Sequence, residues 1–138
     1  MKFLLDTNIV SELRRHAPAA AVLRWFAHVA QDDLYLSVLT AGEVRQSIES
    51  LRRRDSFAAS SLDAWRAELV AAYDDRIISI TADIADLWGR LNVPDRVPTV
   101  DGLLAATALE YDWTLVTRNI ADVERTGART LNPFEPVT

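Results

Sequence analysis

The sequence of 138 residues contains no cysteine, which excludes disulfide bonds and thiolate metal sites. No hydrophobic run approaches the roughly 18 apolar residues of a membrane span. The run Phe3-Leu4-Leu5 ends at Asp6, too early for the apolar core of a signal peptide. The four glycines form no phosphate-binding loop. We therefore expect a protein without a membrane segment, working in the reducing cytoplasm.

Lysine is nearly absent, because Lys2 is the only lysine among the 15 basic residues. Arginine suits bidentate contact with phosphate better than lysine does, although biased genome composition explains the same usage. His16 and His28 belong to no Ser-His-Asp pattern and to no histidine-rich metal motif. The formal net charge of −5 argues against indiscriminate binding to nucleic acid. The composition still permits a local basic groove beside an acidic pocket.

Short apolar segments alternate with segments of helical periodicity along the whole chain. The segments that predict strands are residues 3–5, 34–38, 77–80, 114–117 and 128–131. The segments that predict helices are residues 9–14, a stretch beginning near Pro18, residues 40–51, residues 55–74, a stretch after Thr81, residues 100–110 and a short one from Ile120. This alternation predicts one α/β domain over residues 1–138, with three α/β/α layers and a mostly parallel sheet of about four or five strands.

Four acidic residues stand where a strand-like segment passes into a helix or where a helix begins. They are Asp6 after residues 3–5, Glu43 after residues 34–38, Asp101 at the start of residues 100–110, and Asp122 after residues 114–117. Because ligands bind at the carboxyl ends of strands in open parallel sheets, we expect these acids to gather there. Gathered carboxylates repel one another unless a cation lies among them, and hard divalent cations prefer oxygen ligands. The pattern predicts a metal-dependent enzyme.

Each acid also has a purely structural explanation. Thr40 and Glu43 match a capping box, in which Glu43 would bond to the backbone N–H of Thr40. Asp101 lies in the first turn of a helix, where a negative charge favours the helix dipole. Asp6 is the hardest to explain in this way, because Asn8 already offers a cap for the next helix.

Position relative to the strands separates these acids from others in the chain. Asp122 has a cap-like spacing from Asn119, but it also follows a strand, as Asp6 does. Asp74, Asp75 and Asp112 instead precede strands, so we expect them at the opposite edge of the sheet, in contact with solvent.

Five segments, taken in order, resemble the PIN-domain ribonucleases, in particular the VapC toxins of bacterial toxin–antitoxin pairs and the similar FitB-like branch. The segments are FLLDTN at residues 3–8, SVLTAGEV at 37–44, VDGLLAATA at 100–108, LVTRNIAD at 115–122 and LNPF at 131–134. Each segment alone is weakly specific, but the set covers essentially the whole chain at the family's spacing.

The resemblance implies a metal-dependent endoribonuclease, the toxin of a type II pair, which hydrolyses RNA phosphodiester bonds with a metal-activated water. The implied catalytic and metal-binding residues are Asp6, Glu43, Asp101 and Asp122, with Mg²⁺ or Mn²⁺ as the cofactor. Asp6 and Asp101 would be the firmest ligands. The residues that would orient these carboxylates are Thr7, Asn8, Thr117 and Asn119.

The resemblance also implies partners: RNA, a small DNA-binding antitoxin that inhibits the toxin, and a second copy in a homodimer or larger assembly. The predicted hairpin of residues 41–51 and 55–74 would contribute to the antitoxin groove, with Trp65 as an exposed anchor. Candidates for RNA phosphate contacts are Arg14, Arg15, Arg45 and Arg118, and solvated surface arginines are an equally good explanation of these four.

Three other classes of protein compete with this interpretation. A phosphorelay receiver needs a lysine late in the sheet, and a phosphatase with an aspartate nucleophile needs a second aspartate at the place of Asn8. The chain has neither residue. The third class is a catalytically silent PIN-like binding module that acts through a DNA-binding partner. The presence of all four acids argues against that alternative.

Overall fold

The computed structural model describes residues 1–135, and its centre is a five-stranded sheet in the order β3-β2-β1-β4-β5. The strands are β1 (Phe3–Leu5), β2 (Leu34–Ser37), β3 (Ile77–Ile78), β4 (Thr114–Val116) and β5 (Arg129–Leu131). All paired strands are parallel, and Leu4 of β1 lies in register with Tyr35 of β2 and Leu115 of β4. The central strand β1 is buried at every residue, as expected of a parallel strand covered on both faces.

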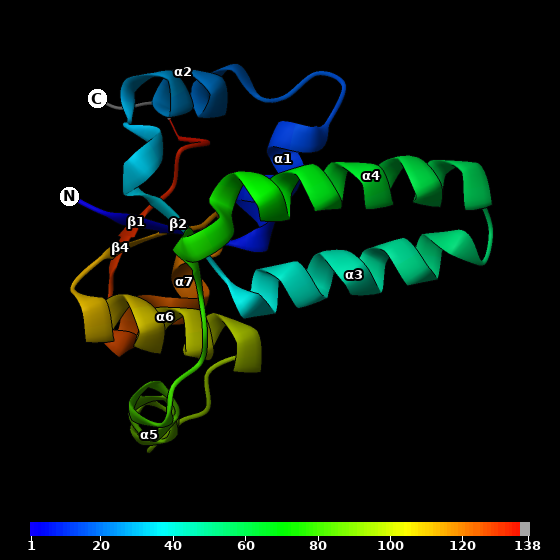
Figure 1. The fold of residues 1–138 in the computed structure, drawn as a ribbon. Helices are drawn as coiled ribbons and strands as arrows, with labels where there is room; N and C mark the ends of the chain where they lie inside the picture. Colours follow the sequence, from blue (N-terminus) through cyan, green and yellow to red (C-terminus); the bar gives the residue numbers. More distant parts are fainter. Residues whose placement is uncertain (136–138) are drawn as a thin grey trace.

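Seven α-helices surround the sheet in the described part of the chain. They are α1 (Thr7–Arg14), α2 (Ala20–His28), α3 (Val38–Arg52), α4 (Ser56–Tyr73), α5 (Ala82–Leu91), α6 (Thr99–Tyr111) and α7 (Ile120–Val123). Figure 1 shows the sheet between α1, α2 and the α3–α4 hairpin on one side and α5 and α6 on the other. The predicted three-layer α/β/α class is confirmed.

Alternation along β1 divides the core into two clusters. Phe3 and Leu5 point to the face covered by α1, α2 and α4, where Ile9 of α1 is fully buried. Leu4 points the other way and packs against Leu104 of α6. Successive side chains of a strand alternate between faces, so a three-residue strand can join both cores. This packing fixes the end of β1, and with it the position of Asp6.

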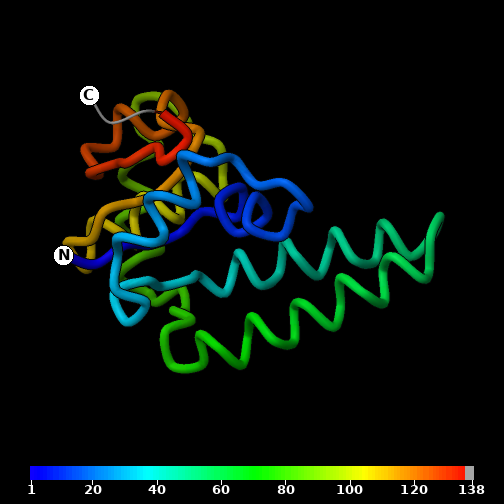
Figure 2. The backbone as a smooth tube through the Cα atoms, turned by 90° about the horizontal axis from the view of Figure 1, so that it is seen from above, coloured from blue at the N-terminus to red at the C-terminus, as the bar shows by residue number. Residues whose placement is uncertain are grey.

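Helices α3 and α4 form a hairpin that extends away from the sheet (Figure 2). It has its own apolar cluster around Ile48 and Ala59. Trp65 packs against this cluster and against the main core, and it is half-buried. The expectation of Trp65 as an exposed anchor is therefore wrong. The exposed aromatic side chain of the hairpin is Phe57, at 87% exposure.

Two helices begin earlier than the sequence predicts, because residues at the strand ends cap them. Ser37 caps α3 by accepting a hydrogen bond from the Leu39 N–H at 3.0 Å, so Thr40 lies inside the helix and the predicted capping box is wrong. Asp6, not Asn8, caps α1 by accepting from the Thr7 N–H at 2.6 Å. Helix capping therefore does not explain the presence of Glu43, but it does explain the presence of Asp6.

The acids that precede strands lie at the opposite edge of the sheet, as predicted. Asp74 and Asp75 form a short turn before β3, and Asp112 lies just before β4. The Asp112 carboxylate accepts from Arg129, the first residue of β5, at 2.9 Å. Within residues 1–135, no helix is long and apolar enough to cross a membrane.

Candidate active site

Asp6 lies at the carboxyl end of the central strand and is only 5% exposed. Its backbone N–H donates to the Val116 carbonyl at 2.9 Å, which ties it to the end of β4. One carboxylate oxygen accepts from the Thr7 N–H, and the other accepts from Thr117 Oγ1 at 2.7 Å and Asn8 Nδ2 at 3.2 Å. Neutral donors therefore hold the Asp6 carboxylate in one orientation without neutralising its charge.

Glu43 faces the same site from the second turn of α3. Thr7 Oγ1 donates to Glu43 Oε1 at 2.5 Å and lies 3.3 Å from the Oγ1 of buried Thr40. Thr7 thus contacts Asp6 through its backbone and Glu43 through its side chain, joining the first two acidic positions. The sequence predicts Thr40 only as a cap. A hydroxyl on the buried side of α3, one turn before Glu43, is the signal that could have placed Thr40 beside the acids.

Asp101 and Asp122 complete the group from the first turn of α6 and from α7. Burial is the largest factor that raises the pKa of Asp101, to about 6, followed by the charge of Asp6, contact with the Asp122 carboxyl and the charge of Glu43. Burial likewise raises the pKa of Asp6, against the lowering effect of its hydrogen bond from Thr117. The structure therefore brings the four predicted acids within electrostatic reach of one another.

The turn after β4 supports this group of acids. Thr117 is buried; its hydroxyl donates to Asp6 and accepts from the Asn119 N–H at 3.0 Å. Asn8 Oδ1 accepts from the Arg118 N–H at 3.3 Å, so the segments after β1 and β4 are joined directly. Asn119 participates through its backbone, because its side chain does not cap α7.

The group of acids fits a hard divalent cation by the chemistry of its donors. All four side chains offer carboxylate oxygens, and hydrogen bonds from Thr117 and Thr7 pre-orient two of them. Within residues 1–135, no group of three or more Asp, Glu or His side chains is arranged so that it could hold a metal ion. Mg²⁺ does not need such a group, because it takes one or two carboxylates and completes its shell with water and phosphate oxygens.

Two of the predicted phosphate-binding arginines, Arg15 and Arg45, pair with acids. The Arg15 guanidinium lies 3.3 Å from Glu12, and Arg45 forms a fork on Asp63 with N–O distances of 3.0 and 3.1 Å. Glu49 also lies 3.2 Å from Arg45. These carboxylates compete with any phosphate for the two arginines.

Arg14 and Arg118 have no ion-pair partner in the part of the chain that the structure describes. The Arg14 guanidinium lies 6.0 Å from the Trp65 ring, and its buried Nε has no hydrogen-bond acceptor among the described residues. The Arg118 guanidinium lies 4.2 Å from the ring of Phe134. Of the four candidates, only Arg14 and Arg118 have a guanidinium group that no described carboxylate pairs with.

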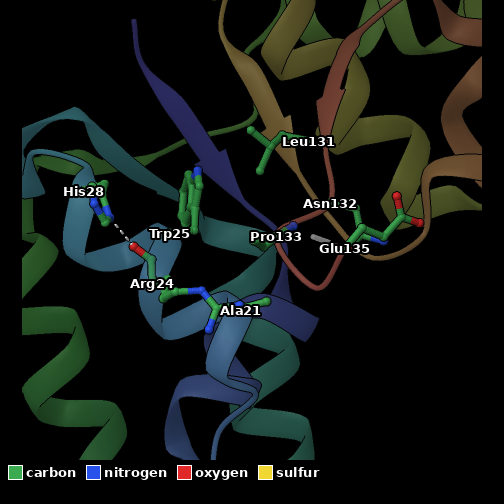
Figure 3. A pocket seen from close by; sticks show the side chains of 8 residues that line it. All are labelled: Ala21, Arg24, Trp25, His28, Leu131, Asn132, Pro133 and Glu135. Carbon is green, nitrogen blue, oxygen red and sulfur yellow. Dashed lines mark hydrogen bonds between the residues drawn. The ribbon is translucent and has the colours of Figure 1, made fainter. Parts of the chain in front are cut away.

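A cavity of about 390 Å³ is separate from the acids. It lies between α2 and the segment after β5 and is lined by Ala21, Arg24, Trp25, His28, Leu131, Asn132, Pro133 and Glu135 (Figure 3). His28 Nδ1 lies 2.6 Å from the Arg24 carbonyl, its partner within the same helix. None of the four acids lines this cavity.

An open parallel sheet with the buried, pre-oriented carboxylate of Asp6 at its carboxyl edge defines the class of α/β proteins that bind ligands at that edge. Residues 3–127 match the PIN domain family, and the chain belongs to that family.

Known relatives cover nearly the full chain. The plasmid stability protein StbB of Pseudomonas syringae pv. tomato is 32% identical, and the VapC ribonuclease Y4jK of Sinorhizobium fredii is 31% identical. Each match covers 96% of this chain and 98% of the relative. The crystal structure of FitAcB from Neisseria gonorrhoeae superposes with a TM-score of 0.88 at 26% identity, covering 97% of this chain and 99% of that one.

Proposed function

We propose that this protein is the toxin of a type II toxin–antitoxin pair and acts in the cytoplasm as a Mg²⁺- or Mn²⁺-dependent endoribonuclease. The observation that carries the proposal is the convergence of four acids with no cationic partner. Asp6 and Asp101 have raised pKa values, and none of the four acids is ion-paired within the described residues. A relative that is named as a VapC ribonuclease agrees with it.

The residues of the site would divide the work of binding the ion. Asp6 and Asp101 would be direct ligands, and Glu43 and Asp122 would act directly or through water. When bound, the ion lowers the pKa of a water molecule and stabilises negative charge on phosphate. Below about pH 6 the Asp101 carboxyl holds a proton, so ion binding must release that proton. Thr117 keeps the Asp6 carboxylate oriented throughout, through its 2.7 Å bond.

The RNA backbone would be held by arginines beside the acids. Of the four candidates, we favour Arg14 and Arg118 for this contact, because the guanidinium groups of Arg15 and Arg45 already pair with carboxylates. Backbone contacts of this kind position the chain for cleavage and carry no sequence information. The single domain would act as a homodimer or larger assembly, restrained by a DNA-binding antitoxin, as the resemblance to VapC toxins implies.

The decisive experiment is incubation of the purified, antitoxin-free protein with a mixed RNA pool in Mg²⁺, in Mn²⁺ and in EDTA. We expect cleavage with either ion, no cleavage in EDTA, and none with the Asp6→Asn variant. Mapping the cut sites would then identify the target. If the folded parent protein leaves every RNA intact under both ions, the nuclease proposal fails. The catalytically silent binding module then becomes the better explanation.

A further inference from the structure

Gly102 lies in the first turn of α6, next to Trp88 of α5 and directly after Asp101 in the sequence. A Cβ atom on Gly102 would lie 3.1 Å from Cδ1 and 3.2 Å from Nε1 of Trp88, and 3.4 Å from Cβ of Val97. Glycine within a helix costs about 0.8–1 kcal/mol relative to alanine. Its presence in the first turn of α6 is explained by this contact, which leaves no room for a methyl group unless a neighbour moves.

The neighbours of Gly102 are held in place by Asn92. Its Nδ2 donates to the Trp88 carbonyl at 2.8 Å, and its Oδ1 accepts from the Val97 N–H at 3.0 Å. Val97 is 5% exposed, and Trp88 Nε1 is buried without an acceptor among the described residues. Asn92 thus fixes the backbone of the two residues whose side chains Gly102 contacts. An added methyl group would therefore require a shift of a few tenths of an ångström, either of the Trp88 ring and Val97 or of the first turn of α6, which carries Asp101.

We propose that Gly102, Trp88 and Asn92 are positioning residues that set the place of Asp101 relative to Asp6. They act through Asp101 and contact neither ion nor RNA. The inference rests on the proposed function for the ion-binding role of Asp101, but the displacement of α6 does not depend on any ion.

Gly102→Ala tests the contact, with Gly89→Ala as a matched control, because a Cβ on Gly89 of α5 would have no atom within 4 Å. Both variants gain helix propensity, so we expect Gly89→Ala to melt at or above the temperature of the parent, whereas in Gly102→Ala the close contact opposes that gain. We expect Gly102→Ala alone to weaken Mn²⁺ binding by about tenfold, the effect of losing an outer support of a metal ligand. Equal Mn²⁺ affinities of the two variants would overturn the proposal.

A second substitution tests whether the Trp88 ring is the obstacle. Trp88→Leu replaces the planar ring with a short branched chain that can turn away from residue 102. The Trp88→Leu/Gly102→Ala double variant should bind Mn²⁺ as tightly as Trp88→Leu alone, a non-additive result typical of residues in contact. Failure of the double variant to recover affinity would also overturn the proposal. If Gly102→Ala alone does not fold, the Mn²⁺ affinity of the double variant, compared with that of Trp88→Leu alone, still tests the proposal.

A metal-free measurement separates this inference from the proposed function. In the NMR spectrum of ion-free protein, Gly102→Ala should shift the resonances of the Asp101 amide and the Trp88 indole N–H. In the Trp88→Leu/Gly102→Ala double variant, the Asp101 amide should return toward its value in the Trp88→Leu single variant. If the parent binds no Mn²⁺, the proposed function fails while these resonances still show whether Gly102 sets the position of α6. Unchanged resonances at both sites in Gly102→Ala would reject the positioning role.

Discussion

The two edges of the sheet carry acids in opposite environments. At the amino edge, the Asp112 side chain is 87% exposed and pairs with Arg129 at 2.9 Å. At the carboxyl edge, Asp6 is buried and bonded only to neutral donors, and its pKa is raised. Asp112 thus has a cationic partner within the chain, whereas Asp6 has none among the described residues.

The α3–α4 hairpin shows the same contrast between an acid of α4 and an acid of α3. Asp63 pairs with Arg45 and Arg52, and these charge-assisted bonds lower the pKa of Asp63. Glu43, two residues before Arg45 in α3, has a threonine hydroxyl as its recorded hydrogen-bond partner instead. The difference lies in the partner that each acid has, because both belong to the same helical hairpin. The comparison predicts that removing charge should matter at the carboxyl edge and matter little at the amino edge.

The largest expected effect is that of Asp101→Asn on RNA cleavage. The change removes a proposed ion ligand, so the loss should exceed the roughly 10–100-fold typical of outer-shell substitutions at metal sites. Asp112→Asn at the amino edge is the control and should retain full activity, with a stability loss of about 0–1 kcal/mol for an exposed ion pair. Initial cleavage rates at saturating Mg²⁺ provide the measurement. Equal losses in the two variants would erase the distinction between the edges.

Glu43→Gln tests the second acidic position without changing its shape. Glutamine can still accept the Thr7 hydroxyl bond, so we expect the free energy of unfolding to stay within about 0.5 kcal/mol of the parent. Activity should fall at least about tenfold, because an outer carboxylate of a metal site is lost. Urea unfolding and cleavage rates measured on one preparation separate the two effects. Full activity would assign Glu43 a structural role.

Thr117→Val removes the hydroxyl that orients Asp6 and accepts the Asn119 N–H. We expect Mn²⁺ affinity to fall by about 10–100-fold and stability to fall by about 1–3 kcal/mol, the desolvation penalty of buried groups left unpaired. Thr117→Ser keeps the hydroxyl and should recover most of the affinity. A serine variant as weak as the valine variant would assign the effect to packing instead of hydrogen bonding.

The smallest expected effect is on the pH dependence of stability in EDTA. The pKa of Asp101 rises from 3.8 to about 6 on folding, so the native state binds more protons than the unfolded state between these values. Stability contributed by this group is present at low pH and is lost as pH rises through about 6. The buried Asp6, also with a raised pKa, acts in the same direction.

Urea unfolding between pH 4 and 7.5 measures this effect. The parent should lose stability relative to Asp101→Asn as the pH increases, since asparagine does not titrate. The Asp112→Asn control should follow the parent. Parallel profiles of parent and Asp101→Asn would show that Asp101 is not perturbed.

Much of the fold could be predicted from local sequence patterns, because the apolar periodicity reports which segments are buried. All five strands and the main helices occur where alternation predicts them, although β3 ends at Ile78 and not at residue 80. The capping of α1 and α3 could not be predicted correctly. Thr40 and Glu43 satisfy the capping-box spacing, but Ser37 ends β2 and takes the cap first.

The sequence could predict that the four acids gather at the carboxyl edge of the sheet, but it could not predict the hydrogen bonds that hold them there. The Asp6–Thr117 bond spans 111 residues and the Thr7–Glu43 bond spans 36. No local pattern reports such contacts, since they depend on how strands are ordered in the sheet. The contact between Gly102 and Trp88 escaped prediction for the same reason.

Mn²⁺ titration of ion-stripped protein, followed by electron paramagnetic resonance, tests most directly whether the carboxyl edge is a cation site. The parent, Asp6→Asn and Asp112→Asn should be compared at one pH above 7, where the Asp101 carboxyl is ionised. The account predicts that parent and Asp112→Asn bind Mn²⁺ alike and that Asp6→Asn loses the site. Binding by Asp6→Asn as tight as that of the parent would contradict it.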